Sequence, residues 1–128
     1  MDAETEWARC APWIEAALEW QRGTHTLEDV RAQIEAGKAV FWPGKRAAVV
    51  TEFFDYPRRR ALNFWLLGGD PVELIKRMRP CIEAWGEANG ATLFLGFGRP
   101  DQHHWAQALR RHGYAPDCIG YAKEVAHG

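Results

Sequence analysis

The stretch FWLLGGDPVELIKRMRPCIEAWGEANG, from Phe64 to Gly90, decides the fold. An apolar run ends in Gly68 and Gly69, and a helix with clear start signals follows. Asp70 suits the N-cap and Pro71 the first helical position. Such a corner either turns the chain or, through free amides and the helix dipole, holds a phosphate.

The helix that follows this corner has an interrupted apolar stripe. Glu73 completes an arrangement similar to a capping box, and Gly90 is a plausible end. Pro80 lies inside the pattern and predicts a kink or break. The stripe consists of Val72, Ile75, Met78, Ile82 and Trp85.

Four segments have strand character. ALNFWLLG, residues 61–68, carries apolar residues on both of its faces, which is typical of a strand covered on both sides. RAAVVTEFFD, residues 46–55, is rich in β-branched and aromatic residues and pairs as a hairpin with KAVFWPGK, residues 38–45. ATLFLGFG, residues 91–98, predicts another buried strand.

The remaining segments predict helices and a last strand. Trp13, Ala17 and Trp20 recur at helical spacing and indicate a first helix that ends near Gly23. A second helix lies within residues 24–37, where Thr26 and Asp29 resemble a capping box. Residues 99–113 predict a loop and a short helix, and YAPDCIGYAKEV, residues 114–125, predicts a last strand pair or one bent strand. The predicted order is α-α-β-β-β-α-β-α-β.

The composition predicts a single domain over residues 1–128, with 47% hydrophobic and 26% charged residues. A net charge of −1 gives no electrostatic reason to expect nucleic acid or an anionic membrane. No apolar run approaches the roughly 18 residues that span a bilayer, and the N-terminus carries no export signal. The three cysteines lack a CxxC motif and indicate reduced thiols in the cytoplasm. Seven tryptophans suit a core, and they suit an interface as well.

The histidines and cysteines predict no metal site. His103 and His104 are adjacent, so on a helix they point about 100° apart. His112 follows His104 by eight residues, which exceeds the usual spacing of helical ligand pairs.

Three motifs together resemble the Gcn5-related N-acetyltransferase (GNAT) superfamily over residues 13–125. These are the strand leading through LLGGD into a long helix, the strand ATLFLGFG, and the closing WAQALRRHGY. GRPDQHHWAQALRRHGY also resembles small GNAT-like proteins encoded by tailed bacteriophages and prophages. The resemblance implies an α/β (α+β) fold with a mixed, mostly antiparallel central sheet flanked by helices on both faces.

The resemblance also implies a site for acetyl-CoA between the central strand and the next one. The backbone that would pair with the pantetheine arm is that of Phe64, Trp65, Leu66 and Leu67, and the phosphate corner would be Gly68, Gly69 and Asp70. Three features oppose phosphate binding: an Asp70 cap occupies the amides and adds negative charge, Pro71 lacks a donor, and the family's longer glycine loop is absent. A tight turn is the alternative. An arginine among Arg58, Arg59, Arg60 and Arg99 could compensate.

The catalytic positions are equally incomplete. Many family members use a tyrosine four residues before the glycine that ends the last helix, and this position is Leu109, which cannot donate a proton. Tyr114 and Tyr121 are the remaining acid candidates nearby, with packing as the alternative role. Glu52 could act as a base through water, and an outward-facing strand residue is the alternative.

Two functions therefore stay open. The first is a GNAT-like protein with degenerate acyl-CoA and catalytic positions and an accessory, virion or protein-interaction role, with a protein partner or self-association. The second is an active acetyl-CoA-dependent N-acetyltransferase acting on an amine of a protein or small molecule. Either would reside in the cytoplasm, or in a virion if phage-encoded.

Overall fold

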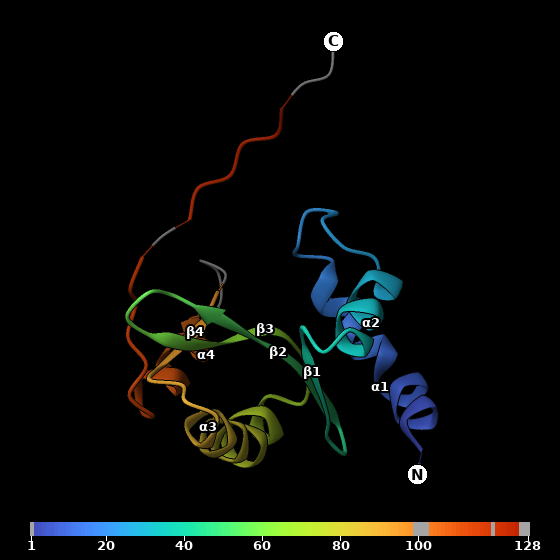
Figure 1. The fold of residues 1–128 in the computed structure, drawn as a ribbon, viewed down its shortest axis with the longest axis horizontal. Coiled ribbons are helices and arrows are strands. Elements are labelled where there is room, and N and C mark those ends of the chain that lie inside the picture. Colours follow the sequence, from blue (N-terminus) through green and yellow to red (C-terminus); the bar gives the residue numbers. More distant parts are fainter. Residues whose placement is uncertain (1, 99–102, 119, 126–128) are drawn as a thin grey trace. The chain divides into compact units, whose positions relative to one another are not determined.

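The computed structural model describes residues 2–98, 103–118 and 120–125 of the chain (Figure 1). These residues form two compact units, Met1–Phe97 and Gly98–Gly128, and each is described by itself. The prediction that all 128 residues form one domain stays a prediction.

The first unit contains one sheet with helices on both faces. Its helices are α1 (Ala3–Leu18), α2 (Leu27–Glu35), the π-helix η1 (Glu73–Met78) and α3 (Arg79–Ala88). Its strands are β1 (Val40–Pro43), β2 (Ala47–Asp55), β3 (Arg60–Gly69) and β4 (Leu93–Gly96). The strand order is β1-β2-β3-β4, in which only the β3–β4 pair is parallel. Figure 1 shows α1 and α2 on one side of the sheet and α3 on the other.

The core on the α1 side forms because α1 has one continuous apolar face. Its buried residues are spaced by three or four positions, and they pack on Ala48, Val50 and Leu66 of the sheet. These residues are Trp7, Cys10, Ile14 and Leu18. Burial raises the pKa of the Cys10 thiol, so this cysteine serves as an apolar packing residue.

The prediction of which residues form the buried face of α1 was partly wrong. Trp20 was expected on it, but Trp20 lies beyond the end of α1 and is 59% exposed. The apolar repeat begins at Trp7, and counting from Trp7 leads to Leu18 as the last buried position. The predicted capping box of the second helix is confirmed, because Thr26 and Asp29 exchange both hydrogen bonds.

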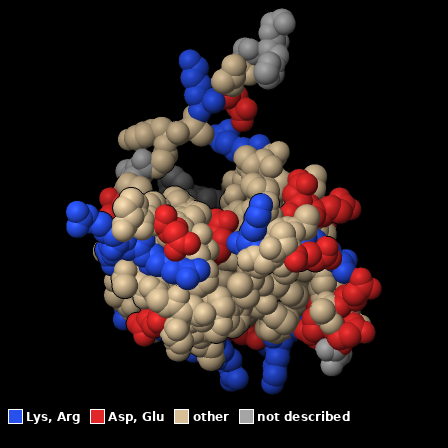
Figure 2. All heavy atoms as spheres, viewed as in Figure 1, with Lys and Arg blue, Asp and Glu red and all other residues tan. Residues whose placement is uncertain are grey.

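The opposite face of the sheet packs on α3 through aromatic rings. The Trp85 ring lies 5.1 Å from the Trp42 ring and 5.5 Å from the Phe53 ring. Gly86 lets the helix approach Leu62, since an added Cβ there would lie 2.8 Å from a Leu62 methyl carbon. Acidic side chains gather over the other side, that of α1 and α2 (Figure 2).

The second unit contains α4 (His103–Arg110). The predicted last strand is wrong for the part of the chain that the structure describes, since residues 114–118 and 120–125 form no strand. Pro116 lacks an N–H for a ladder, and Tyr121 and Val125 are exposed rather than packed.

Candidate functional site

The C-terminal half of β3 has an open edge. β4 pairs with β3 only from Ala61–Leu93 to Phe64–Gly96, whereas β3 continues to Gly69. Within the described residues, no strand pairs with this side of Trp65–Gly69. The backbone predicted to bind the pantetheine arm, at Phe64, Trp65, Leu66 and Leu67, therefore begins at the last paired residue and runs along the open edge.

A β-bulge lies where this edge opens, next to the last residue of β3 that pairs with β4. Val50 pairs with Leu66, but Thr51 pairs with Phe64, so Trp65 is an extra residue in β3. A bulge bends its strand and increases the local twist. The Trp65 side chain is anchored on the α1–α2 connection. Its indole donates to Gln21 Oε1 at 3.4 Å, and its ring lies 4.9 Å from the His25 ring.

Packing alone requires both glycines of the corner. A Cβ on Gly68 would overlap with the Trp13 carbonyl oxygen of α1. Gly69 has a φ of +104°, and a Cβ there would overlap with the Arg46 carbonyl oxygen. The glycine pair is thus explained without a ligand.

The amides of the corner are largely occupied. The Asp70 amide donates to the Arg46 carbonyl at 2.9 Å, and the Leu74 amide donates to the Asp70 carbonyl at 3.1 Å. The predicted Asp70 cap is confirmed, since Asp70 Oδ2 accepts from the Glu73 amide at 3.1 Å. Pro71 has no N–H. A phosphate at this corner would therefore depend on side-chain donors.

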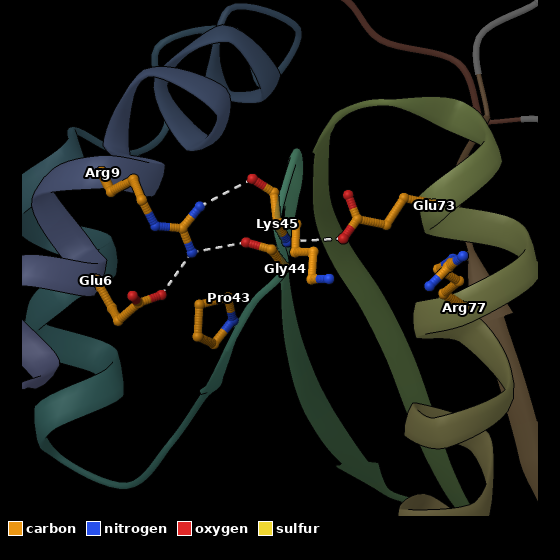
Figure 3. Close-up of a pocket in the computed structure, with 7 residues that line it drawn as sticks. All are labelled: Glu6, Arg9, Pro43, Gly44, Lys45, Glu73 and Arg77. Carbon is orange, nitrogen blue, oxygen red and sulfur yellow. Dashed lines mark hydrogen bonds and ion pairs between the residues drawn. The ribbon is translucent and has the colours of Figure 1, made fainter. Parts of the chain in front are cut away.

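The side chain of Glu73 does not complete a capping box, and this expectation was wrong. Glu73 is only 9% exposed, and its carboxylate accepts from the Lys45 amide at 2.7 Å and the Arg46 amide at 2.6 Å. Burial of a carboxylate is favourable only where donors replace its water, and the β1–β2 turn supplies these donors. Glu73 thus fastens the turn to the start of the helix, as Figure 3 shows for Lys45.

Two adjoining depressions of about 590 and 350 Å³ lie at this junction and share Lys45, Glu73 and Arg77. Arg46 and Asp70 line the smaller one. Figure 3 shows Arg77 on the helix side of the larger depression, opposite Arg9 of α1. We call Lys45, Arg46 and Arg77 the basic cluster.

Arg9 has a structural role at the edge of this site. Its guanidinium donates to the Gly44 carbonyl at 2.6 Å and the Lys45 carbonyl at 3.0 Å, and it pairs with Glu6. The hydrogen bond from Arg9 lowers the pKa of Glu6. The basic cluster differs, because its three cations form no ion pair with the residues that the structure describes. They are available to an anion.

The arginines named from the sequence lie elsewhere. Arg58, Arg59 and Arg60 precede or begin β3, whereas the corner lies at the other end of the same strand. Ten residues of strand separate them by roughly 30 Å. These three arginines cannot compensate at the corner, and Arg99 lies outside the described residues.

The predicted break near Pro80 takes the form of a π-helix. The Arg79 amide donates to the Leu74 carbonyl, five residues back, and the Arg79 side chain donates to the Ile75 carbonyl at 3.1 Å. Val72, which was expected on the apolar stripe, precedes this segment and is 59% exposed. Short π segments are frequent at functional sites.

The two catalytic candidates lie in different units. Glu52 on β2 is half-buried, and its Oε1 accepts from Asn63 Nδ2 at 3.1 Å. Tyr114 follows α4 in the second unit, where its amide donates to the Leu109 carbonyl. In the described part of the chain, no group of three His, Cys, Asp or Glu side chains could hold a metal. None of its helices is both long and apolar enough to cross a membrane.

Solved structures share this fold. A protein described as a probable acetyltransferase aligns over 100% of this chain and 97% of its own, with a TM-score of 0.72 and 9% identity. TTHA1254 from Thermus thermophilus aligns over 99% and 95%, with a TM-score of 0.67 and 13% identity. A possible acetyltransferase from Clostridium difficile 630 aligns over 89% and 87%, with a TM-score of 0.55 and 11% identity.

The sequence itself matches no protein-family model and no curated protein. The likeness in structure therefore carries the fold alone. The predicted fold class is confirmed: the chain has a mixed α/β, GNAT-like fold with a mostly antiparallel sheet.

Gly69→Ala tests whether packing requires the corner glycines. We expect the free energy of unfolding to fall by at least about 2 kcal/mol, because Ala is strained at positive φ and overlaps with Arg46. Urea denaturation measures it. Gly96→Ala is the control, since Gly96 has open space around it. Equal effects of the two substitutions would contradict the explanation.

Glu73→Ala tests the fastening of the β1–β2 turn. We expect a loss of about 2–4 kcal/mol in unfolding free energy, because two backbone amides lose a charged acceptor. Glu87→Ala, at an exposed position on α3, should change stability by less than about 0.5 kcal/mol. A Glu73→Ala protein as stable as the Glu87→Ala control would show that the turn holds without this carboxylate.

Proposed function

We propose that the chain binds acetyl-CoA and transfers the acetyl group to an amine. The observation that carries this proposal is the open edge of β3, which begins at the Trp65 bulge and ends beside the basic cluster. An open edge offers backbone donors and acceptors to an extended amide-containing arm. The cations at its end suit the phosphates of the same ligand.

The phosphates would bind side chains rather than backbone. Most corner amides have partners, so the basic cluster would supply the positive charge. Arginine and lysine both bind phosphate well, arginine with two parallel donors. Asp70 beside them weakens this attraction and makes the site a modest one.

The chemistry requires little from the protein. The amine nitrogen attacks the thioester carbonyl carbon, so a C–N bond forms and the C–S bond breaks. Sulfur leaves as a thiolate and takes a proton from solvent, while the amine proton passes to Glu52, directly or through water. Positioning of the two reactants supplies most of the acceleration in such a scheme.

A second candidate is an accessory protein that has lost transfer activity. Two observations favour it: the occupied corner amides, and Leu109 at the position of the acid that the family resemblance implies. The Tyr114 acid, the phage origin, the virion role and a protein partner or self-association stay predictions.

Calorimetry with acetyl-CoA at low salt tests the proposed function. We expect binding with a Kd on the order of micromolar, about tenfold weaker in the Lys45→Gln, Arg77→Gln double variant, because exposed charge pairs contribute up to about 1 kcal/mol each. Lys38→Gln with Arg58→Gln removes the same charge elsewhere and should leave the affinity unchanged. Absence of binding to the wild type would refute the proposal and favour the accessory role.

Asp70→Ser distinguishes the helix-capping role of Asp70 from the effect of its negative charge on phosphate binding. Serine still caps the helix, so stability should change by less than about 0.5 kcal/mol. Removal of the carboxylate should raise acetyl-CoA affinity by up to about tenfold, because a like charge near the phosphates is lost. If the wild type binds and Asp70→Ser binds no more tightly, the phosphates lie away from this corner.

A further inference from the structure

Asn63 carries a buried oxygen that lacks a partner. The residue lies in β3 and is 2% exposed, and its Nδ2 donates to Glu52 Oε1 at 3.1 Å. Its Oδ1 is buried and accepts no hydrogen bond from the described residues. A carboxylate oxygen can only accept, so the Asn63 nitrogen must face Glu52. The Asn63 oxygen is therefore the atom without a partner. Buried polar atoms without partners are rare and call for an explanation.

The Asn63–Glu52 pair lies on the α1 side of the sheet, next to the bulge. Val50 packs in the α1 core, and strand alternation places Glu52 on the same face. Asn63 is the cross-strand partner of Glu52 on one side and of Leu95 on the other. It precedes the extra residue Trp65 by two positions, so the pair is close to the start of the open edge.

We propose that Asn63 is a positioning residue for the amine that accepts the acetyl group. Its Nδ2 orients the Glu52 carboxylate, and its Oδ1 accepts one N–H of the amine, while Glu52 accepts another. The inference rests on the proposed acetyl transfer and adds the residue that would select and orient the acceptor. It also explains why a buried oxygen is left open.

The charge of the pair specifies the kind of ligand. The carboxylate of Glu52 and the Asn63 oxygen are both acceptors, and the pair carries a negative charge, so it favours a ligand that brings donors and positive charge. A primary ammonium group brings both, and it loses one proton to solvent before its nitrogen attacks the thioester. The acidic side chains over α1 and α2, on the same side of the sheet, add to the attraction for a cation (Figure 2).

A buried water that donates to Oδ1 is the competing explanation. It differs in its consequence for stability. If Asn63 Oδ1 has no partner in the free protein, Asn63→Leu should stabilise the fold, because an unpaired polar atom is replaced by an apolar group of similar size. If a water satisfies Oδ1, the same substitution removes a hydrogen bond and lowers stability.

NMR titration without acetyl-CoA provides the first test, so that its result is independent of cofactor binding. We expect n-butylammonium to shift the side-chain amide signals of Asn63, assigned by their loss in Asn63→Asp, in a saturable manner. Tetramethylammonium has the same charge and no N–H, and it should leave them unchanged. Glu52→Gln should weaken butylammonium binding by about tenfold, since a charged hydrogen bond becomes neutral. Equal shifts with both cations, or none with either, would overturn the proposal.

Asn63→Leu provides the second test. The thermal midpoint should rise. We expect butylammonium to shift the Trp65 indole signal in the wild type, and this shift should be lost in Asn63→Leu. In a transfer assay with a primary amine, the KM for the amine should rise while the KM for acetyl-CoA stays unchanged. A lower thermal midpoint with unchanged amine binding would assign Asn63 to the fold alone. Failure of acetyl-CoA to bind the wild type would instead refute the proposed transfer.

Discussion

The extra residue in β3 is the constraint on which the candidate site depends. Without Trp65, β3 would pair evenly with β2, and nothing in the β2–β3 register would bend it beyond Phe64. With it, the pairing to β4 ends one residue before the bulge, and the rest of the strand keeps an open edge. The cost of inserting a residue is offset by the contacts of its ring and indole with His25 and Gln21. Through Trp65, the bulge therefore packs the sheet against the segment between α1 and α2.

At the corner that ends this edge, the candidate anion site consists of side-chain cations rather than backbone amides. Gly69 and Asp70 contact the Arg46 carbonyl, and Glu73 binds the amides of Lys45 and Arg46, so turn and helix hold each other tightly. The helix start loses free donors as well, because the Asp70 amide donates to the Arg46 carbonyl and the Glu73 amide donates to Asp70 Oδ2. This arrangement also fixes the β1–β2 turn beside Arg77, which gathers three cations where the donors were lost. The corner is both a turn and a candidate phosphate site.

Local signals predicted much of the fold, whereas the site depends on contacts that no local signal carries. The Asp70 cap, the Thr26 capping box and the strand around Phe64 could be predicted because each acts within a few residues. Lys45 and Arg77 are 32 positions apart, and only the hairpin and the helix start bring them together. Glu73 fits a capping box by its spacing, but a distant turn offers two donors instead of one. The bulge leaves no mark in an apolar run such as ALNFWLLG.

The other buried polar residues of this unit differ from Asn63 in their hydrogen-bond partners. Thr51 is fully buried, and its hydroxyl accepts from the Trp42 indole at 3.0 Å. Glu73 at the sheet end accepts from two amides. Each of these groups has the partner that burial requires, and each therefore belongs to the fold. Asn63 is the exception among these buried side chains, because only its nitrogen is satisfied by the residues that the structure describes. The proposed amine would complete this group, which lies beside a carboxylate and a bulge.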